Sequence, residues 1–430
     1  MSRTTIISFL VSRVLCAGLC SLAFLPIGNL WAQTSPPTAS SAARTLKQAF
    51  DAAWLRQPEA QSLDQRREAA EARRQIAESW TANPPTLELS DKTDQPLKNQ
   101  GYREYVAGVA LPLWLPGERS QTGALAEAES NAVGSRASAA QLRTAAAVRV
   151  AWWDWQRARV EQTLASERLE SARCLAIDVA KRVKAGDLAR SDQHQADGAA
   201  ASAEVTLVEA GSTLAATTQH LRALTGAMPD AGSGDSAEPA PAVPADFSTL
   251  DATHPAVREL FDRAEVARRV ADLAKVQSRN NPELLLATTS QRGAFGDDWQ
   301  QTITVGVRFP FGSESRNRAK VETARAEAIE SEGLLRLEQE RLASDLDAAR
   351  LHVEAAQTRQ AAADKRARLA RESRAFFEKS FRLGETDLPT RLRIEFEAVE
   401  ADRQSTRARI DLAASISTLR QVMGLLPEQK

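Results

Sequence analysis

The 430-residue chain has little of several features that common protein classes require. Its 55 basic and 56 acidic residues give a net charge of -1, so it lacks the positive excess with which general nucleic-acid binders hold phosphate. Aromatic residues make up only 5% of the chain, fewer than compact cores usually carry, and alanine is abundant instead. Small, helix-favouring residues in polar surroundings favour long, closely packed helices.

Long apolar runs are absent except at the N-terminus, which excludes a helical membrane protein. There Arg3 and Arg13 precede the apolar residues 14–25, and small or turn-forming residues follow, as in a secretory signal peptide of residues 1–32. A lipoprotein signal is the alternative, with a lipid anchor at Cys16 or Cys20. Residues 33–44, rich in Ser, Thr, Pro and Ala, are typical of a flexible lead, and we expect an exported protein.

Patterns for catalysis or metal binding are also scarce. Cys174 is the one cysteine outside the signal, so no disulfide can form within the mature chain. Asp192 and His194 could touch a metal, but residues two apart on a helix diverge and a solvated surface is the simpler interpretation. No phosphate loop, nucleophile elbow or zinc-protease signature occurs. We therefore expect no enzyme, no cofactor and no metal site. The histidines are scattered, at His194, His220, His254 and His352.

Landmarks that recur 198 residues apart show that the chain is a duplicated unit. The pairs are Asn83-Pro84 and Asn281-Pro282, Pro112 and Pro310, Gly186 and Gly384, and Gly226 and Gly424. We assign residues 45–227 to the first repeat and 249–426 to the second. Residues 228–248, rich in Pro, Gly and Ser, are a linker, and residues 427–430 are a tail.

Each repeat is predicted to contain a helix, two strands and two long helices. The first helices are expected over residues 60–81 and 256–280, where the Asn-Pro pairs stop them. In the last strand, alternate residues share one apolar face, namely Ile303, Val305, Val307 and Phe309. The equivalent strand of the first repeat keeps this parity, with Tyr105, Ala107, Val109 and Leu111. Strands with one apolar and one polar face are half-buried.

An unbroken helical stretch follows each strand pair and ends at Gly186 or Gly384. Residues 118–185 would span about 100 Å as a helix, longer than globular domains contain. A second helix returns toward Gly226 or Gly424. Small and apolar residues recur at heptad spacing in the second repeat, which predicts a coiled-coil seam. The row comprises Leu335, Leu342, Ala349, Ala356, Ala363, Ala370 and Phe377, with Leu346 and Val353 beside it.

Four strands are too few to close a membrane barrel alone, and open edges cannot face lipid, so several chains must contribute. Three features of the chain are its duplication, its strand-to-helix turns at residues 112–119 and 310–316, and its helical tips at residues 182–188 and 381–386. In these three features the chain resembles the TolC-like outer-membrane efflux proteins. The resemblance covers essentially the whole mature chain. The wording LPLWLPGER of residues 111–119 is similar to the branch that serves cobalt, zinc and cadmium exporters.

This resemblance implies a fold that is mainly α with a small β part. Long coiled-coil helices of a homotrimer would form an α-barrel in the periplasm, and four strands per chain would contribute to a 12-stranded β-barrel in outer-membrane lipid. It also implies two partners, a periplasmic adapter and an inner-membrane pump of the RND or ABC type. The function would be that of a passive efflux duct for heavy-metal cations or drugs.

Three groups of residues are candidates for this function. The resemblance places adapter docking at the tips, although the same residues could simply cap helices and carry solvated charges; they are Arg182, Lys184, Gly186, Leu188, Arg382, Leu383, Gly384 and Thr386. Acidic residues near the tips could form a cation-selecting gate or merely favour helix starts, namely Asp187, Asp192, Glu385 and Asp387. The apolar face of the last strand would meet lipid.

Aromatic residues leave two choices open. Those flanking the strands fit an interfacial belt or plain strand propensity, and they are Tyr102, Tyr105, Trp114, Phe295, Trp299, Phe309 and Phe311. Trp152, Trp153 and Trp155 cannot share one helix face, which favours packing against neighbouring segments over a ligand-stacking platform. Two other classes remain as alternatives to a duct: a periplasmic adapter, which would carry one helical hairpin rather than two, and a coiled-coil scaffold without a pore.

Overall fold

The computed structural model describes residues 43–95, 99–230, 237–242, 253–312 and 314–428. The chain divides after Ser40 into two units, and the described residues all belong to the second, Ser41–Lys430. The predicted signal peptide, with Cys16 and Cys20, lies outside the described residues, as do most of the lead and much of the linker. No helix in the described ranges is long and apolar enough to cross a membrane.

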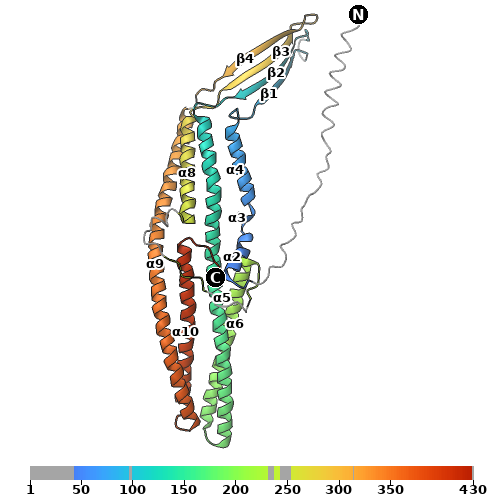
Figure 1. Cartoon of the computed structure of the whole chain (residues 1–430). Coiled ribbons are helices and arrows are strands. Elements are labelled where there is room, and N and C mark those ends of the chain that lie inside the picture. Colours follow the sequence, from blue (N-terminus) through green and yellow to red (C-terminus); the bar gives the residue numbers. More distant parts are fainter. Residues whose placement is uncertain (1–42, 96–98, 231–236, 243–252, 313, 429–430) are drawn as a thin grey trace. The chain divides into compact units, whose positions relative to one another are not determined.

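Two long helices run along most of the length of this unit (Figure 1). Helix α5, Glu118–Ala185, has the expected bounds, and its 68 residues span about 100 Å. Helix α9, Glu314–Arg382, is its counterpart in the second repeat. The left-handed caps are confirmed, because φ is 87° at Gly186 and 78° at Gly384. Helices α6, Arg190–Thr225, and α10, Leu388–Val422, return from the tips and complete two helical hairpins.

Four strands form one antiparallel sheet at the other end of α5 and α9 (Figure 1). They are β1 (Thr86–Thr93), β2 (Arg103–Pro112), β3 (Glu283–Arg292) and β4 (Gln300–Arg308), in the spatial order β1-β2-β3-β4. The two strands expected in each repeat are thus present, and β2 pairs with β3 to join the repeats. Within the described residues, β1 and β4 each have one edge without a strand partner. The fold is mainly α with a small β part, as predicted.

The shorter helices before the sheet differ from the prediction at their ends. Helices α2 (Leu46–Leu55), α3 (Pro58–Gln61) and α4 (Leu63–Glu78) precede β1, and α8 (Pro255–Val276) precedes β3. The expected helices 60–81 and 256–280 are therefore α4 and α8, and both end before the Asn-Pro pairs. The prediction that those pairs stop the helices was wrong by several residues.

The turn after β2 explains why α4 ends early. The indole of Trp114 donates to the carbonyl of Ser79, and the Arg119 guanidinium donates to the carbonyl of Glu78. These contacts satisfy carbonyl groups that a helix end leaves unpaired, so the helix can stop there. In the second repeat Asn317, which corresponds to Arg119, donates its amide to the carbonyl of Ser278 after α8. In both repeats a side chain at this position therefore donates to a carbonyl group near the end of the preceding helix, but the residue differs.

The helices are packed in a fixed lateral order. Toward the sheet, α5 contacts α4 and α8, and α8 contacts α9; toward the tips, α5 contacts α6 and α10, and α10 contacts α9 (Figure 1). The unit therefore has one long edge made of β4 and α9 and a second made of β1, α4 and α6. The predicted heptad row of α9 lies on the packed side of the helix, since its residues are all buried or half-buried.

The middle of α5 is the most heavily enclosed part of the unit. Trp152, Trp153 and Trp155 are all buried and pack in one cluster with α2, with Leu221 of α6 and with Ile410 of α10. The indole of Trp153 also donates to the hydroxyl of Ser417 at 2.9 Å. The packing explanation for the three tryptophans is therefore confirmed, because all three are buried among helices, although Trp153 also lines a small cavity of about 200 Å³.

A buried ionic cluster ties the linker to both repeats. Glu238, from the described linker residues 237–242, is only 4% exposed. Its carboxylate accepts two bonds from Arg149 of α5, at 2.8 and 3.1 Å, and pairs with Arg420 of α10 at 3.2 Å. Ser417 donates to it as well, at 2.6 Å. One buried carboxylate thus pairs with two buried guanidinium groups that come from different repeats, and Arg420 pairs in addition with Glu428 at 2.8 Å.

Candidate functional sites: the sheet face and the helical tips

The four strands place their apolar side chains on one common face. The register puts Leu87, Val109, Leu286 and Val305 in one row across the sheet and Leu89, Ala107, Thr288 and Ile303 in the next. A third row holds Leu111, Leu284 and Val307. Ile303 is 83% exposed and Val305 67%, so nothing in this unit covers the face. The shared parity of the strands is confirmed, and it produces an apolar band whose rows run across the sheet.

The opposite face of the sheet is mostly polar or small, with Val106 and Leu285 as its larger apolar residues. Glu88, Gly108, Ala287 and Thr304 form the row behind the first apolar row. The Cβ that Gly108 lacks would lie 3.0 Å from the Cβ of Ala287, so a larger residue would crowd the neighbouring strand. This difference between the faces is the arrangement expected when one side meets lipid and the other meets water.

Aromatic residues flank the apolar band on both sides. Tyr105 stacks on Trp299 with 5.5 Å between ring centroids, and the Arg292 guanidinium lies 5.2 Å from the Trp299 ring. At the helix side, Phe309 and Phe311 are exposed. Trp80, which sequence reasoning did not single out, is 93% exposed in the segment between α4 and β1, at the opposite edge of the sheet. The belt remains a hypothesis, but each of these exposed rings now has a place at one end of the strands.

The first tip connects α5 to α6 through residues 186–189. The amide of Asp187 donates to the carbonyl of Arg182, and the amide of Gly186 to that of Val183, which closes the helix end. Of the proposed docking residues, Lys184 and Gly186 are exposed. Leu188 instead packs against an apolar cluster shared by the two hairpins. The structure therefore leaves only part of this tip accessible.

The second tip connects α9 to α10 through residues 383–387. The amide of Glu385 donates to the carbonyl of Ser380, and the hydroxyl of Ser380 lies 2.6 Å from that of Thr386. Leu383 and Gly384 are exposed. Arg382, also exposed, pairs with Glu378 one turn earlier. The hydrogen bond from Arg382 holds the pKa of the Glu378 carboxyl below its usual value.

The acidic gate candidates lie in two different settings. Asp192 accepts a hydrogen bond from the amide of Ala189 at 3.0 Å, so it caps the start of α6. Asp387 is the residue before α10, and Glu385 lies within 3.5 Å of Ser380. Asp187 is exposed. Within the described ranges, no three His, Cys, Asp or Glu side chains gather closely enough to hold a metal ion.

Phe381 joins the two hairpins at the tips. Its buried ring lies against Arg182 of α5 and Arg391 of α10, whose guanidinium carbons are 4.8 and 4.7 Å from the ring centroid. The nitrogen of Arg182 also lies 3.5 Å from Asp178. Leu175, Val179 and Leu388 complete this apolar cluster, to which all four tip helices contribute. Arg182 is thus packed between the hairpins and is not free at the surface.

Comparisons with known proteins agree with this geometry. Residues 50–227 match the family model described as outer membrane efflux protein. The structure is similar to the outer membrane protein VceC of Vibrio cholerae, with a TM-score of 0.69 at 16% identity over 88% of this chain and 96% of that chain. It is also similar to the CmeC outer membrane channel of Campylobacter jejuni, with a TM-score of 0.69 at 15% identity over 91% of this chain and 90% of that chain. For the open state of the MtrE outer membrane channel of Neisseria gonorrhoeae, the TM-score is 0.70 at 14% identity, over 89% of each chain.

The match to the family model covers the first repeat of the chain. No curated protein matches the chain. The likeness to the solved structures extends the same fold over both repeats.

The residues that hold the two tips together were missed at the sequence level. Phe381 and Arg391 showed no motif, and only the former lay in a segment that carried the family resemblance. A periodicity signal existed, because Phe381 falls four residues after Phe377 of the heptad row. This periodicity could not show that Arg182 and Arg391, from different helices, would both lie against the Phe381 ring.

Proposed function

We propose that three copies of this chain form a passive outer-membrane duct for efflux, whose strands close a 12-stranded barrel and whose helices form a tunnel in the periplasm. The observation that carries the proposal is the open sheet with one exposed apolar face and two unpartnered edges. Isolated, such a sheet would expose backbone groups to lipid at both edges. The match of residues 50–227 to the outer membrane efflux protein family supports the same conclusion.

The two edges of the unit support a closed ring of identical subunits. Strands β1 and β4 run antiparallel to each other across the sheet, so β4 of one copy can pair with β1 of the next without reversing direction. In the same ring α9 would meet α4 and α6 of the next copy. Exposed apolar residues lie on α9 at Leu369 and Phe376, just after it at Leu383, and on α6 at Val205 and Val208. One head-to-tail interface would therefore bury sheet edges and helix faces together.

The test of this proposal is the oligomeric state and conductance of the purified chain. In mild detergent, mass measurement should give three chains per particle, and the particle should conduct ions across a planar lipid bilayer. A monomer without conductance, or a protein recovered only in the soluble periplasmic fraction, would contradict the proposal and favour a scaffold without a pore.

The partners belong to the proposal as well. We infer that the exposed parts of the tips, around Lys184, Gly186, Leu383 and Gly384, bind a periplasmic adapter that links the duct to an inner-membrane pump of the RND or ABC type. Heavy-metal cations are one candidate cargo and drugs are the other. A deletion strain tested against metal ions, dyes and antibiotics would distinguish the two, because only the exported class should become more toxic.

Proline at both tip glycines should abolish export without preventing assembly. Gly186 and Gly384 have φ values of 87° and 78°, whereas proline holds φ near -65°, so each tip must refold locally. Neither glycine has a neighbouring atom within 4 Å of the missing Cβ, so the effect stays at the tip. We expect Gly186→Pro with Gly384→Pro to give normal trimer yield and the resistance of a deletion strain. The matched control replaces Gly198, which lies within α6 in open space, by alanine and should export normally.

A further inference from the structure

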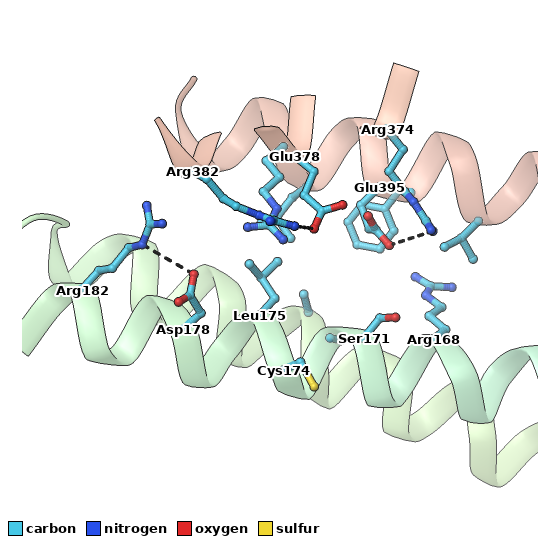
Figure 2. Close-up of a pocket in the computed structure, with 16 residues that line it drawn as sticks. Arg168, Ser171, Cys174, Leu175, Asp178, Arg182, Arg374, Glu378, Arg382 and Glu395 are labelled. Atoms are coloured by element: carbon cyan, nitrogen blue, oxygen red, sulfur yellow. Dashed lines mark hydrogen bonds and ion pairs between the residues drawn. The ribbon is translucent and has the colours of Figure 1, made fainter. Parts of the chain in front are cut away.

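A cavity of about 480 Å³ lies between the two hairpins, just before the tips. Residues from α5, α9 and α10 form most of its wall, and Ala199 of α6 adds to it. Figure 2 shows Arg168, Ser171, Cys174 and Leu175 on one side of this cavity and Arg374, Glu378 and Arg382 on the other. The volume suits a small molecule rather than a single ion. The hairpins therefore enclose a space in which a ligand could contact both repeats.

The wall of this cavity carries more positive than negative charge. Five arginines face three carboxylates. Each carboxylate already has an arginine partner (Figure 2): Asp178 pairs with Arg182, Glu395 with Arg374, and Glu378 with Arg382. The two remaining arginines are Arg168 and Arg391. No carboxylate in the described part of the chain pairs with either of them.

Aromatic rings lie against both of these arginines. The guanidinium carbon of Arg168 lies 5.0 Å from the centroid of Phe396, and that of Arg391 lies 4.7 Å from the centroid of Phe381. Arg182 faces the same Phe381 ring, so two like charges lie close together there. Burial lowers the pKa of Arg391, and the nearby charges of Glu378, Glu395 and Asp178 offset part of this effect without forming an ion pair with it. A guanidinium that is stacked but unpaired keeps its in-plane hydrogen-bond donors available.

We propose that this cavity binds a small multivalent oxyanion, a phosphate ester or an oligocarboxylate, between Arg168 and Arg391. The planar fork of each arginine matches the oxygen pairs of phosphate and carboxylate groups. The Ser171 hydroxyl on the wall offers a further donor. Because Arg168 belongs to α5 and Arg391 to α10, the bound anion would link the first hairpin to the second. Its presence would therefore hold the two hairpins together next to the tips.

Direct binding to the purified full chain in detergent tests this site. The probes are inorganic pyrophosphate and citrate, which carry phosphate and carboxylate oxygens respectively, titrated calorimetrically at constant ionic strength. At least one of them should bind, and the one that binds identifies the oxyanion class. Arg168→Gln and Arg391→Gln should each weaken the affinity by about tenfold or more, since each removes charge-assisted hydrogen bonds. The absence of binding by both probes, or unchanged affinity in both variants, would overturn the proposal.

Two controls separate this site from general charge effects. Arg393→Gln removes the same charge from α10 outside the cavity, where Arg393 pairs with Glu397, and it should bind the probe as the parent chain does. Arg391→Lys keeps the charge but loses the planar fork, so it should bind with intermediate affinity even if a glutamine variant misfolds. Cys174 lines the cavity and is exposed, so its alkylation by iodoacetamide should slow when the anion is bound. If the rate of Cys174 alkylation does not change when the anion is added, any binding occurs elsewhere and the proposed site is refuted.

Discussion

Replacing Glu238 by glutamine is expected to lower the free energy of unfolding by about 3 to 5 kcal/mol, because it leaves the buried Arg149 without its counter-ion and removes one of the two carboxylates that pair with Arg420. Arg149 and Arg420 are each 3% exposed, so water cannot take over the role of the carboxylate. The neutral amide could still accept one hydrogen bond but could not offset the charge of Arg149. The linker segment that carries Glu238 should then separate from α5 and α10, and the two repeats should lose a contact that holds them together.

Thermal and denaturant unfolding, followed by helix ellipticity, measure this effect. The matched control is Glu259→Gln, which removes a carboxylate from a largely exposed pair with Arg143 at 2.8 Å. Exposed pairs contribute about 0 to 1 kcal/mol, so the control should shift the midpoint little. Equal shifts in the two variants would show that burial of the Glu238 cluster adds nothing to its energy.

Arginine at Val305 should block assembly in the membrane. Val305 lies in the central apolar row of the exposed sheet face, and a charge at the bilayer midplane costs about 2 to 4 kcal/mol in each chain. Because each subunit of the proposed ring would carry this free-energy cost, the total cost of assembly increases with the number of subunits. We expect Val305→Arg to abolish trimer yield in outer-membrane extracts and to leave helix content largely intact.

Thr304→Arg is the matched control for this change. Thr304 is the neighbouring residue on the same strand, is also exposed, and faces the opposite side of the sheet. A charge there would face the interior of the proposed barrel and should permit assembly. If the two variants assembled equally well, or if only Thr304→Arg failed, the assignment of the faces to lipid and water would be wrong.

Several elements followed from the sequence because each depends on local pattern. The unbroken helix Glu118–Ala185, the caps at Gly186 and Gly384, and the parity of Val305 and Val109 rest on spacing along one segment. Backbone periodicity places residues on faces without reference to the rest of the chain. The repeat of landmarks at one separation likewise needed only the sequence to be compared with itself.

Helix ends were less predictable because distant residues decide them. Helix α4 stops at Glu78, where Trp114 donates to the carbonyl of Ser79 and Arg119 donates to the carbonyl of Glu78. Those residues are more than thirty positions later in the chain. Asn281, assigned as a helix stop, instead donates to the carbonyl of Leu113 at 3.0 Å and joins the two repeats. A landmark can therefore mark a conserved position in both repeats while performing a tertiary task.

The sequence by itself determined the helical rods, their caps, the number of strands and the apolar side of the second strand in each repeat, because these depend on the order of residues within single segments. Only the tertiary structure decided that the two hairpins share one sheet, that Glu238 lies between Arg149 and Arg420, and that Arg168 and Arg391 face one cavity. Charges come together across hundreds of residues only when the chain is folded, and no local pattern records which of them will meet.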